Sequence, residues 1–217
     1  MNILAIETTS QLATVAIRDH QGIIREESSS ERLSHLQNLM PMIDTLLASC
    51  QLQLDDIGCI AVSSGPGSFT GIRIGIATAK ALGQFLAIKI ISVPTLQAMV
   101  YNRMDYEGLL CPMLDARRGQ VYGAAFRWEA EGTGKSCLEI IKPGPYMETE
   151  FRALLEKARI GRPLLLLGEE SQTATNIAKL GFDLYNKGAA SSFYEIKPVY
   201  MRKSEAEQKL EDQRKLK

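Results

Sequence analysis

Residues 63–83, SSGPGSFTGIRIGIATAKALG, follow an apolar run and lead, through a turn of glycine and proline, into a segment with helical periodicity. This order predicts a buried strand, a tight turn and a helix whose first backbone N–H groups are free to bind an anion. The glycine spacing does not fit the dinucleotide-binding fingerprint, and the loop does not end in the Gly-Lys-Ser/Thr of a P-loop. Glycine can also serve the conformation of the turn or close packing, so both interpretations stay open.

The predicted helix at 70–87 carries small residues at every fourth position, which form one smooth stripe on its surface. The stripe and the isoleucines beside it consist of Gly71, Gly75, Ala79, Ile72 and Ile76. Glycine inside a helix costs about 1 kcal/mol relative to alanine, so two on one face need a reason. Close approach of another backbone is the expected reason. The neighbour is either a predicted helix of the same chain, at 34–49, or a helix of a second chain.

Apolar patterning divides the chain near residue 100. The first half reads as three short strands, a helix at 34–49, a buried strand, the helix at 70–87 and a closing strand. Ser34 is the expected N-cap of the first helix, and Pro41 is expected to kink it because proline removes one backbone hydrogen bond. The order β-β-β-α-β-α-β joins a meander to alternating units and predicts an α/β fold with parallel pairing.

The second half, residues 101–217, loosely repeats the opening hairpin. Its expected elements are a hairpin with a turn at 117–119, a glycine-rich linker at 129–136, a helix at 148–159 and a strand at 162–169. The charged tail at 200–217 is expected to be a solvated terminal helix or a frayed end. We therefore expect two domains, 1–100 and 101–217, with the terminal helix free to return to the first.

Composition excludes several classes of function. Lysine plus arginine number 25 and aspartate plus glutamate 25, so the chain lacks the basic balance of a stand-alone nucleic-acid binder. Independent tRNA binding would depend on a small basic patch at 115–120 and the tail. The four cysteines form no CxxC pair, and His20 and His35 lack metal-ligand spacing, so we expect neither a metal site nor a catalytic set. No basic leader and no run of about 20 apolar residues occurs, and we expect a cytoplasmic protein.

The end of the first predicted strand offers one candidate site. Glu7, Thr8 and Thr9 resemble a turn that holds phosphate with hydroxyl and N–H groups while the acid orients a metal-bound water. Together with Gly65 and Gly67 they favour an alternative function, that of an ATP-binding kinase or ATPase. The other interpretation is that Glu7 is an ordinary surface residue at a strand end.

Five segments together resemble the TsaB (YeaZ) family, over residues 1 to about 207: MNILAIETTSQLATVAI, SHLQNLMPMIDTLL, GPGSFTGIRIGIATAKAL, MLDARRGQVYGAAF and PVYMRKSEAE. The resemblance implies the actin-like, sugar-kinase and Hsp70-type (ASKHA) fold, an α/β architecture of two RNase H-like lobes with the second reduced. It also implies a role in the synthesis of threonylcarbamoyladenosine, the modified adenosine 3′ of the anticodon in tRNA.

The resemblance implies a scaffold and not an enzyme, because the larger paralogue TsaD carries the metal-binding HxxxH and transfers the threonylcarbamoyl group, whereas this chain has no HxxxH. The implied partners are TsaD and the ATPase TsaE, a second copy of the chain when TsaD is absent, and tRNA only through the complex. No intrinsic cofactor is implied; ATP or ADP and metal belong to the partners. The implied partner interface lies on two first-lobe helices and comprises Leu36, Leu39, Met40, Ile43, Gly71, Ile72, Gly75, Ile76 and Ala79. Glu7, Thr8, Thr9, Gly65 and Gly67 would be a vestigial nucleotide site.

Overall fold

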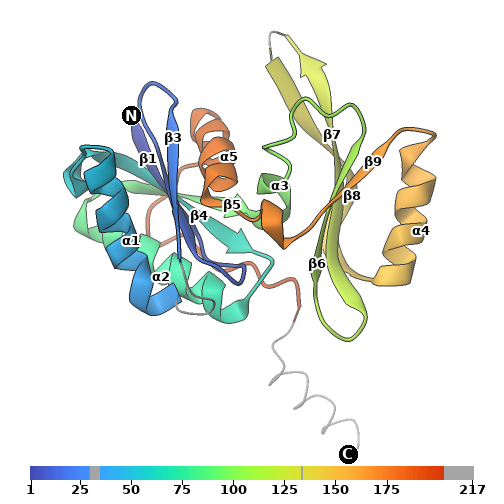
Figure 1. The fold of residues 1–217 in the computed structure, drawn as a ribbon, viewed down its shortest axis with the longest axis horizontal. Helices are drawn as coiled ribbons and strands as arrows, with labels where there is room; N and C mark the ends of the chain where they lie inside the picture. Colours follow the sequence, from blue (N-terminus) through green and yellow to red (C-terminus); the bar gives the residue numbers. More distant parts are fainter. Residues whose placement is uncertain (30–34, 133, 203–217) are drawn as a thin grey trace, which may run out of the picture.

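The computed structural model describes residues 1–29, 35–132 and 134–202, without the side chains of residues 35–37. Within these residues the chain forms two β-sheets, one in each half, with helices between them and on their outer faces (Figure 1). The predicted N-cap Ser34, the side chain of Leu36 and the tail beyond Arg202 lie outside what the structure describes.

The first sheet has the strand order β3-β2-β1-β4-β5. Its strands are β1 (Asn2–Glu7), β2 (Thr14–Arg18), β3 (Ile24–Ser28), β4 (Ile57–Gly65) and β5 (Lys89–Pro94). The first three strands form an antiparallel meander, while β4 pairs parallel with both β1 and β5. Strands β1 and β4 are apolar almost throughout because both of their faces are buried. The predicted order β-β-β-α-β-α-β is confirmed.

Helices α1 (His35–Ser49) and α2 (Phe69–Phe85) cover one face of this sheet (Figure 1). Helix α1 continues through Pro41 to Ser49. Helix α2 begins after Ser68, whose side chain accepts a hydrogen bond from the Gly71 N–H and so caps the helix. The apolar sides of both helices and the facing strands form one core, which includes Leu4, Ile43, Val62, Ile72 and Ile76. Burying these side chains holds both helices on the sheet.

The opposite face of the first sheet is covered by a helix from the second half of the sequence. This helix, α5 (Ala174–Asn186), packs against β1 and β2, and its Gly181 lies close to Ala61 of β4. Helix α5 is not among the elements predicted from the sequence. The predicted domain boundary at residue 100 therefore separates the strands of the two sheets. Helix α5, however, packs on the first sheet although it lies after this boundary.

The second sheet has the order β8-β7-β6-β9, which repeats the first four positions of the first sheet. Its strands are β6 (Leu109–Asp115), β7 (Gln120–Glu131), β8 (Gly134–Met147) and β9 (Leu164–Leu167). The predicted linker at 129–136 is wrong: residues 129–131 belong to β7 and residues 134–136 to β8, and Glu131 pairs with Gly134 in this long hairpin. Helix α4 (Glu148–Arg159) has the predicted bounds and packs on the outer face of this sheet through Phe151 and Leu155.

The described elements form five layers: the α1–α2 pair, the first sheet, α5 with the short α3 (Thr95–Ala98), the second sheet, and α4 (Figure 1). The shortest elements are the 3-10 turns η1 (Leu54–Asp56) and η2 (Glu169–Ser171). One buried core, including Ala5, Leu96, Leu110 and Ile177, runs from the first sheet through α3 and α5 to the second. The two lobes are therefore joined by a common apolar core at the side of α5.

Candidate functional site

The glycine stripe of α2 faces the sheet of its own lobe. A Cβ added at Gly71 would lie 1.8 Å from the Thr8 carbonyl oxygen, and one at Gly75 would lie 2.4 Å from Thr8 Oγ1. The Thr8 hydroxyl donates a hydrogen bond to the Gly71 carbonyl over 2.8 Å. The small residues of α2 therefore allow close approach of the β1–β2 turn. This position is occupied neither by the helix predicted at 34–49 nor by a helix of a second chain.

Two backbone donors at the start of α2 bind acceptors within the chain. The Ser68 N–H donates to the Thr9 carbonyl over 2.8 Å, and the Gly71 N–H donates to Ser68 Oγ over 3.2 Å. Gly67, at φ 151°, lets this loop approach Thr9, where a Cβ would meet Thr9 Cβ at 2.6 Å. The glycine-rich loop therefore docks one turn of the protein on another, which favours the packing interpretation over anion binding by these donors.

Glu7 and Thr8 lie beneath the protein surface, fully buried, and Thr9 is almost so. Glu7 Oε1 accepts hydrogen bonds from the Thr9 N–H at 2.5 Å and from the Thr9 hydroxyl at 2.6 Å. Ser63, on the neighbouring strand β4, lies beside Glu7, and its side chain interacts with the carboxyl. Burial raises the pKa of the Glu7 carboxyl above its usual value, and the hydrogen bonds from Thr9 only partly oppose this. The prediction that Glu7 is a surface residue is wrong, and its carboxyl cannot touch a ligand in solvent.

Replacing Glu7 by glutamine is expected to stabilise the protein at neutral pH and to flatten its pH dependence. A carboxyl whose pKa is raised on folding contributes stability that is present at low pH and is lost as pH rises through the folded-state pKa. That loss begins above the ordinary value of 4.5. Glutamine keeps the acceptor for Thr9 without the buried charge, so we expect Glu7→Gln to be more stable than the wild type at pH 8, with the difference shrinking toward pH 5.

Urea unfolding of the wild type and Glu7→Gln between pH 5 and 8 measures this effect. The control Glu131→Gln changes an exposed glutamate on β7 and should follow the wild type. A Glu7→Gln protein that is less stable at pH 8, or that keeps the wild-type pH slope, would contradict the assignment of a raised pKa to Glu7.

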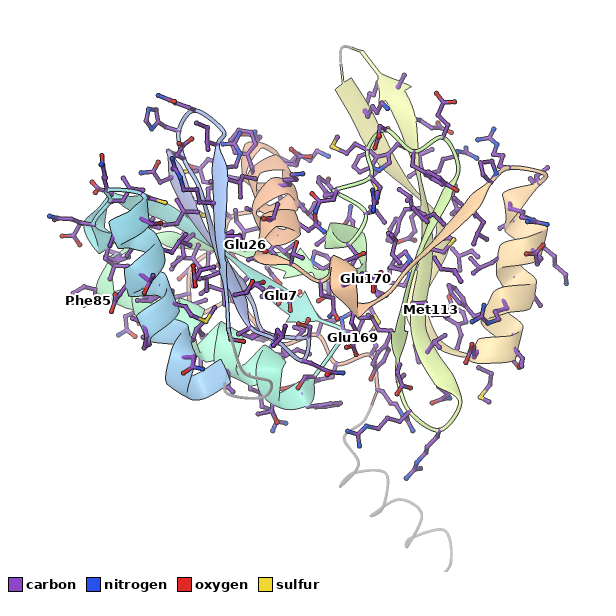
Figure 2. All side chains as sticks on the ribbon, viewed as in Figure 1. Glu7, Glu26, Phe85, Met113, Glu169 and Glu170 are labelled. Atoms are coloured by element: carbon purple, nitrogen blue, oxygen red, sulfur yellow. The ribbon has the colours of Figure 1, made fainter. Side chains whose placement is uncertain are left out.

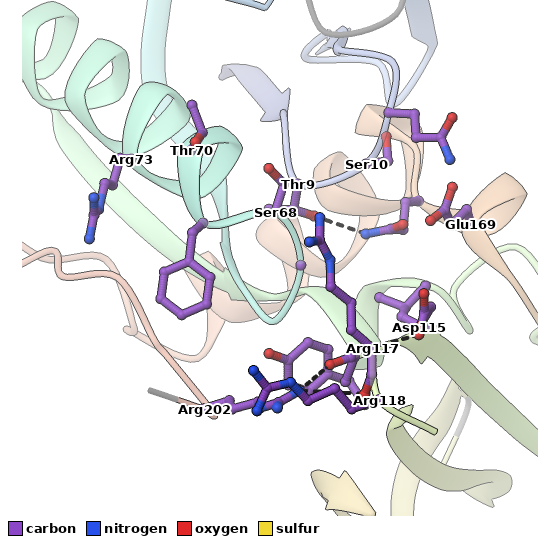
Figure 3. Close-up of a pocket in the computed structure, with 17 residues that line it drawn as sticks. Thr9, Ser10, Ser68, Thr70, Arg73, Asp115, Arg117, Arg118, Glu169 and Arg202 are labelled. Atoms are coloured by element: carbon purple, nitrogen blue, oxygen red, sulfur yellow. Dashed lines mark hydrogen bonds between the residues drawn. The ribbon is translucent and has the colours of Figure 1, made fainter. Parts of the chain in front are cut away.

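A cleft of about 630 Å³ opens between the two lobes (Figure 3). One wall is formed by the β1–β2 turn and the start of α2, and the other by the β6–β7 turn, with the ends of η2 and of the described chain nearby. The polar and charged residues that line it are Thr9, Ser10, Gln11, Ser68, Thr70, Arg73, Asp115, Arg117, Arg118, Tyr122, Glu169, Gln172 and Arg202. Of the predicted nucleotide-binding residues, Thr9 and Gly67 line the cleft, whereas Glu7, Thr8 and Gly65 do not.

A chain of hydrogen bonds forms the floor of the cleft and crosses between the two halves of the sequence. Gln172, which follows η2, donates from Nε2 to Thr9 Oγ1 over 2.9 Å, and the Thr9 hydroxyl in turn donates to Glu7. Glu169 and Asp115 are the carboxylates on the cleft wall, and Asp115 Oδ1 accepts the N–H of Arg117 over 2.7 Å. Sequence analysis did not single out Arg73, Gln172 or Arg202, because these residues come together only in the fold.

Most residues of the predicted partner interface are buried inside the chain and do not lie on the outer surface of α1 and α2. Leu39 and Ile43 on α1, and Gly71, Ile72, Gly75, Ile76 and Ala79 on α2, are buried in the chain's own cores. Their packing against the first lobe's sheet and its β1–β2 turn, and not contact with a partner, explains their residue types. Met40 is 40% exposed and remains available, while the side chain of Leu36 lies outside the described residues.

Other side chains make up the outer faces of these two helices. Helix α2 exposes Ala77 and Ala81, one turn apart, and ends in Phe85, whose side chain is 77% exposed and points outward from the first lobe (Figure 2). Helix α1 exposes Thr45 and Ala48 along with Met40. Small residues at helical spacing beside exposed apolar ones allow another helix to approach closely. Of the residues exposed here, only Met40 belongs to the predicted interface, and the others lie at neighbouring positions on the same two helices.

Two further expectations concern metals and membranes. No group of three or more histidine, cysteine, aspartate or glutamate residues that could hold a metal ion occurs in the part of the chain that the structure describes. Cys50, Cys59, Cys111 and Cys137 are free thiols, and burial raises the pKa of Cys59 and of Cys111 to about 12. Within the described ranges, the helices are too short or too polar to cross a bilayer.

Two sheets of one strand order, with a cleft between them, define a two-lobed protein of the actin-like, sugar-kinase and Hsp70-type class whose second lobe is reduced. The solved structure of YeaZ from Pseudomonas aeruginosa has this fold: it superposes with a TM-score of 0.73 at 22% identity, over 92% of this chain and 99% of that one.

Sequence comparison gives the family. The family model described as "TsaD: tRNA N6-adenosine threonylcarbamoyltransferase" matches residues 2–210. The tRNA threonylcarbamoyladenosine biosynthesis protein TsaB of Bacillus subtilis is 33% identical over 172 residues, which are 79% of this chain and 72% of that protein. The protein of the same name from Escherichia coli is 28% identical over 228 residues, covering 97% and 98%. The chain therefore belongs to the TsaB (YeaZ) family.

Proposed function

We propose that this protein is a non-catalytic subunit in the synthesis of threonylcarbamoyladenosine in tRNA, and that it acts by pairing with the transferase TsaD. The names of its relatives support a place in this synthesis. The outer face of α1 and α2 supports the pairing, since it exposes Phe85 and Met40 beside the small residues Ala77 and Ala81. This exposed face is the observation that carries the proposal.

The partner face fits a helix pair of a related subunit. TsaD belongs to the family model that matches this chain, so its own first lobe offers two helices of similar kind. Two such pairs would bury their exposed apolar side chains in a four-helix bundle. In the absence of TsaD the same face pairs with a second copy of this chain. TsaE joins the assembly, tRNA is contacted through the complex, and ATP or ADP and metal are held by the partners in the cytoplasm.

The alternative function, that of an ATP-dependent kinase or ATPase, is not supported by the positions of the residues that suggested it. Glu7 and Thr8 are fully buried behind Thr9 and do not line the cleft. General-base or metal chemistry by Glu7 would need contact between its carboxyl and a ligand or water in the cleft. Thr9 and Gly67 alone supply no group that moves a proton at neutral pH.

Light scattering on a size-exclusion column tests the pairing. We expect the protein alone to elute as a homodimer, and an equimolar mixture with TsaD from the same source to elute as a one-to-one heterodimer. The mixture should lose the homodimer peak, because both complexes use one face. Two unchanged peaks, with and without ATP and TsaE, would contradict the proposal.

A further inference from the structure

The last described residues run from the first lobe to the second beside the cleft. Residues 199–202 contact the start of α2 at one end and the β6–β7 turn at the other (Figure 3). We propose that these residues form a strap that holds the two lobes at one angle, and that its release frees the second lobe to turn about the core around α3 and α5. The proposal concerns this chain alone and does not rest on the proposed function.

The strap is attached to the first lobe by a backbone bond and by an aromatic stack. The Val199 N–H donates to the Ser64 carbonyl, near the end of β4, over 2.9 Å. The Tyr200 ring stacks on Phe69 of α2 with ring centroids 4.8 Å apart, and its hydroxyl accepts a hydrogen bond from Arg73 Nε over 2.9 Å. These contacts hold the first end of the strap on both β4 and α2.

The loop after β4 leaves room for the strap. Gly65 has φ 113°, and a Cβ added to it would lie 2.6 Å from the Val199 carbonyl oxygen. Ile196, shortly before the strap, is 3% exposed and belongs to the core beneath α1 and α2. Glycine at position 65 thus allows the close approach of the strap, which gives this residue a role other than binding a nucleotide.

The other end of the strap is attached to the second lobe by Arg202. Its Nη1 donates to the Ala116 carbonyl, between β6 and β7. Burial raises the pKa of the Tyr122 hydroxyl on β7, and the nearby charge of Arg202 opposes that rise. Met201 packs against the core that joins the lobes. Consecutive residues of the strap therefore contact the first lobe, the shared core and the second lobe in turn.

The turn that receives Arg202 is itself fixed to the second lobe. The Arg117 N–H donates to Asp115 Oδ1 over 2.7 Å, and the Glu148 N–H, at the start of α4, donates to the Gly119 carbonyl over 3.0 Å. A hydrogen bond to a loose loop would hold only that loop. Because this turn is bonded to its own strand and to α4, the bond from Arg202 holds the lobe.

The shared core alone does not set the angle between the lobes. It consists of apolar side chains around α3 and α5, including Leu96 and Ile177 (Figure 1). Apolar contacts are non-directional, and domains turn and slide at interfaces of this kind. The strap joins the lobes at a second place, at the start of α2, through hydrogen bonds that have a preferred direction. This second attachment opposes rotation about the first.

Double electron–electron resonance between spin labels on the two lobes tests the proposal. The label sites are Ser28→Cys on β3 and Ala153→Cys on α4, which are both exposed. The partly exposed Cys50 and Cys137 are replaced by serine so that they take no label. Dilution with an excess of unlabelled protein restricts the measured distances to those within one chain. We expect one narrow distance distribution for the protein with an intact strap.

Two variants each release one end of the strap. Arg202→Ala removes the contact with the second lobe, and Tyr200→Ala removes the stack on α2, so each should broaden the distance distribution and shift its mean. The double variant should match the single ones, because either change already releases the same strap. Arg202→Lys keeps a donor for the Ala116 carbonyl and should retain the narrow distribution.

Matched controls make the same changes away from the strap. Arg162→Ala and Tyr194→Ala replace an exposed arginine before β9 and a tyrosine that is 75% exposed, and both should keep the narrow distribution. Far-ultraviolet circular dichroism of every variant separates a released strap from a lost fold.

Three results would overturn the proposal: a broad distribution with the strap intact, a narrow one in folded Arg202→Ala and Tyr200→Ala, or equal broadening in the two controls. None of these depends on pairing with TsaD, and the column experiment does not measure the angle between the lobes. The two proposals therefore fail separately.

Discussion

Replacing Gly71 by alanine is expected to prevent the protein from folding stably. The new Cβ would lie 1.8 Å from the Thr8 carbonyl oxygen and 2.9 Å from its carbon, so the clash is with backbone and not with a flexible side chain. Relief requires α2 to move away from the β1–β2 turn. That movement would break the hydrogen bonds from Thr8 to Gly71 and from Ser68 to Thr9. We expect a cost above about 3 kcal/mol, a large part of the 5–15 kcal/mol that stabilises a typical domain.

Soluble yield and thermal melting by circular dichroism measure this effect. Gly134→Ala is the matched control, since its Cβ would meet only the Glu131 carbonyl oxygen at 3.8 Å and its φ is not in the left-handed region. The control should melt within a few degrees of the wild type. A Gly71→Ala protein that also does so would show that α2 is not fixed against Thr8.

This packing changes how the partner interface must be tested. From the sequence alone, Gly75→Leu and Ile76→Arg are expected to break pairing and leave the fold intact. The structure shows that expectation to be wrong, because Ile76 is buried in the first-lobe core and a Cβ at Gly75 would meet Thr8 Oγ1 at 2.4 Å. Loss of a complex in either variant would report misfolding.

The sequence predicts an element best when one face of it is buried and the other is exposed to solvent. Helix α4 alternates buried Phe151 and Leu155 with charged residues, and its bounds follow from that pattern. Helix α5 has a similar contrast between its buried side and its more exposed side, but it carries Gly181 where it touches Ala61. Glycine inside a helix lowers helix propensity, which weakens the sequence signal for this helix. The end of the β7–β8 hairpin was predicted as a linker because its glycines are typical of both turns and linkers.

The candidate site was less predictable, for two physical reasons. Helical spacing shows that Gly71, Gly75 and Ala79 share a face, but it does not show which neighbour that face meets. Side chains that line the cleft, such as Arg73 and Arg202, are 129 positions apart in the numbering and meet only through tertiary packing. The hydrogen bond from Gln172 to Thr9, the residue that covers Glu7, likewise joins residues 163 positions apart.

Introducing arginine at Ala77 or Ala81 is expected to abolish pairing with TsaD while leaving the fold unchanged. Both alanines are exposed on the outer side of α2, so arginine there projects into water in the free protein and is a good helix former. In the proposed helix bundle the same side chain would be buried without a countercharge. An uncompensated buried charge costs about 3–5 kcal/mol, which corresponds to a loss of affinity of at least about a hundredfold.

Ala153→Arg on α4 is the matched control, since it makes the same change at an exposed helix position in the second lobe. All three variants should melt as the wild type does, and Ala153→Arg alone should still co-elute with TsaD. The homodimer should be lost in the same variants that lose TsaD, because one face serves both. Co-elution of Ala81→Arg and Ala77→Arg with TsaD would place the interface on another surface and leave the exposed Phe85 without an explanation.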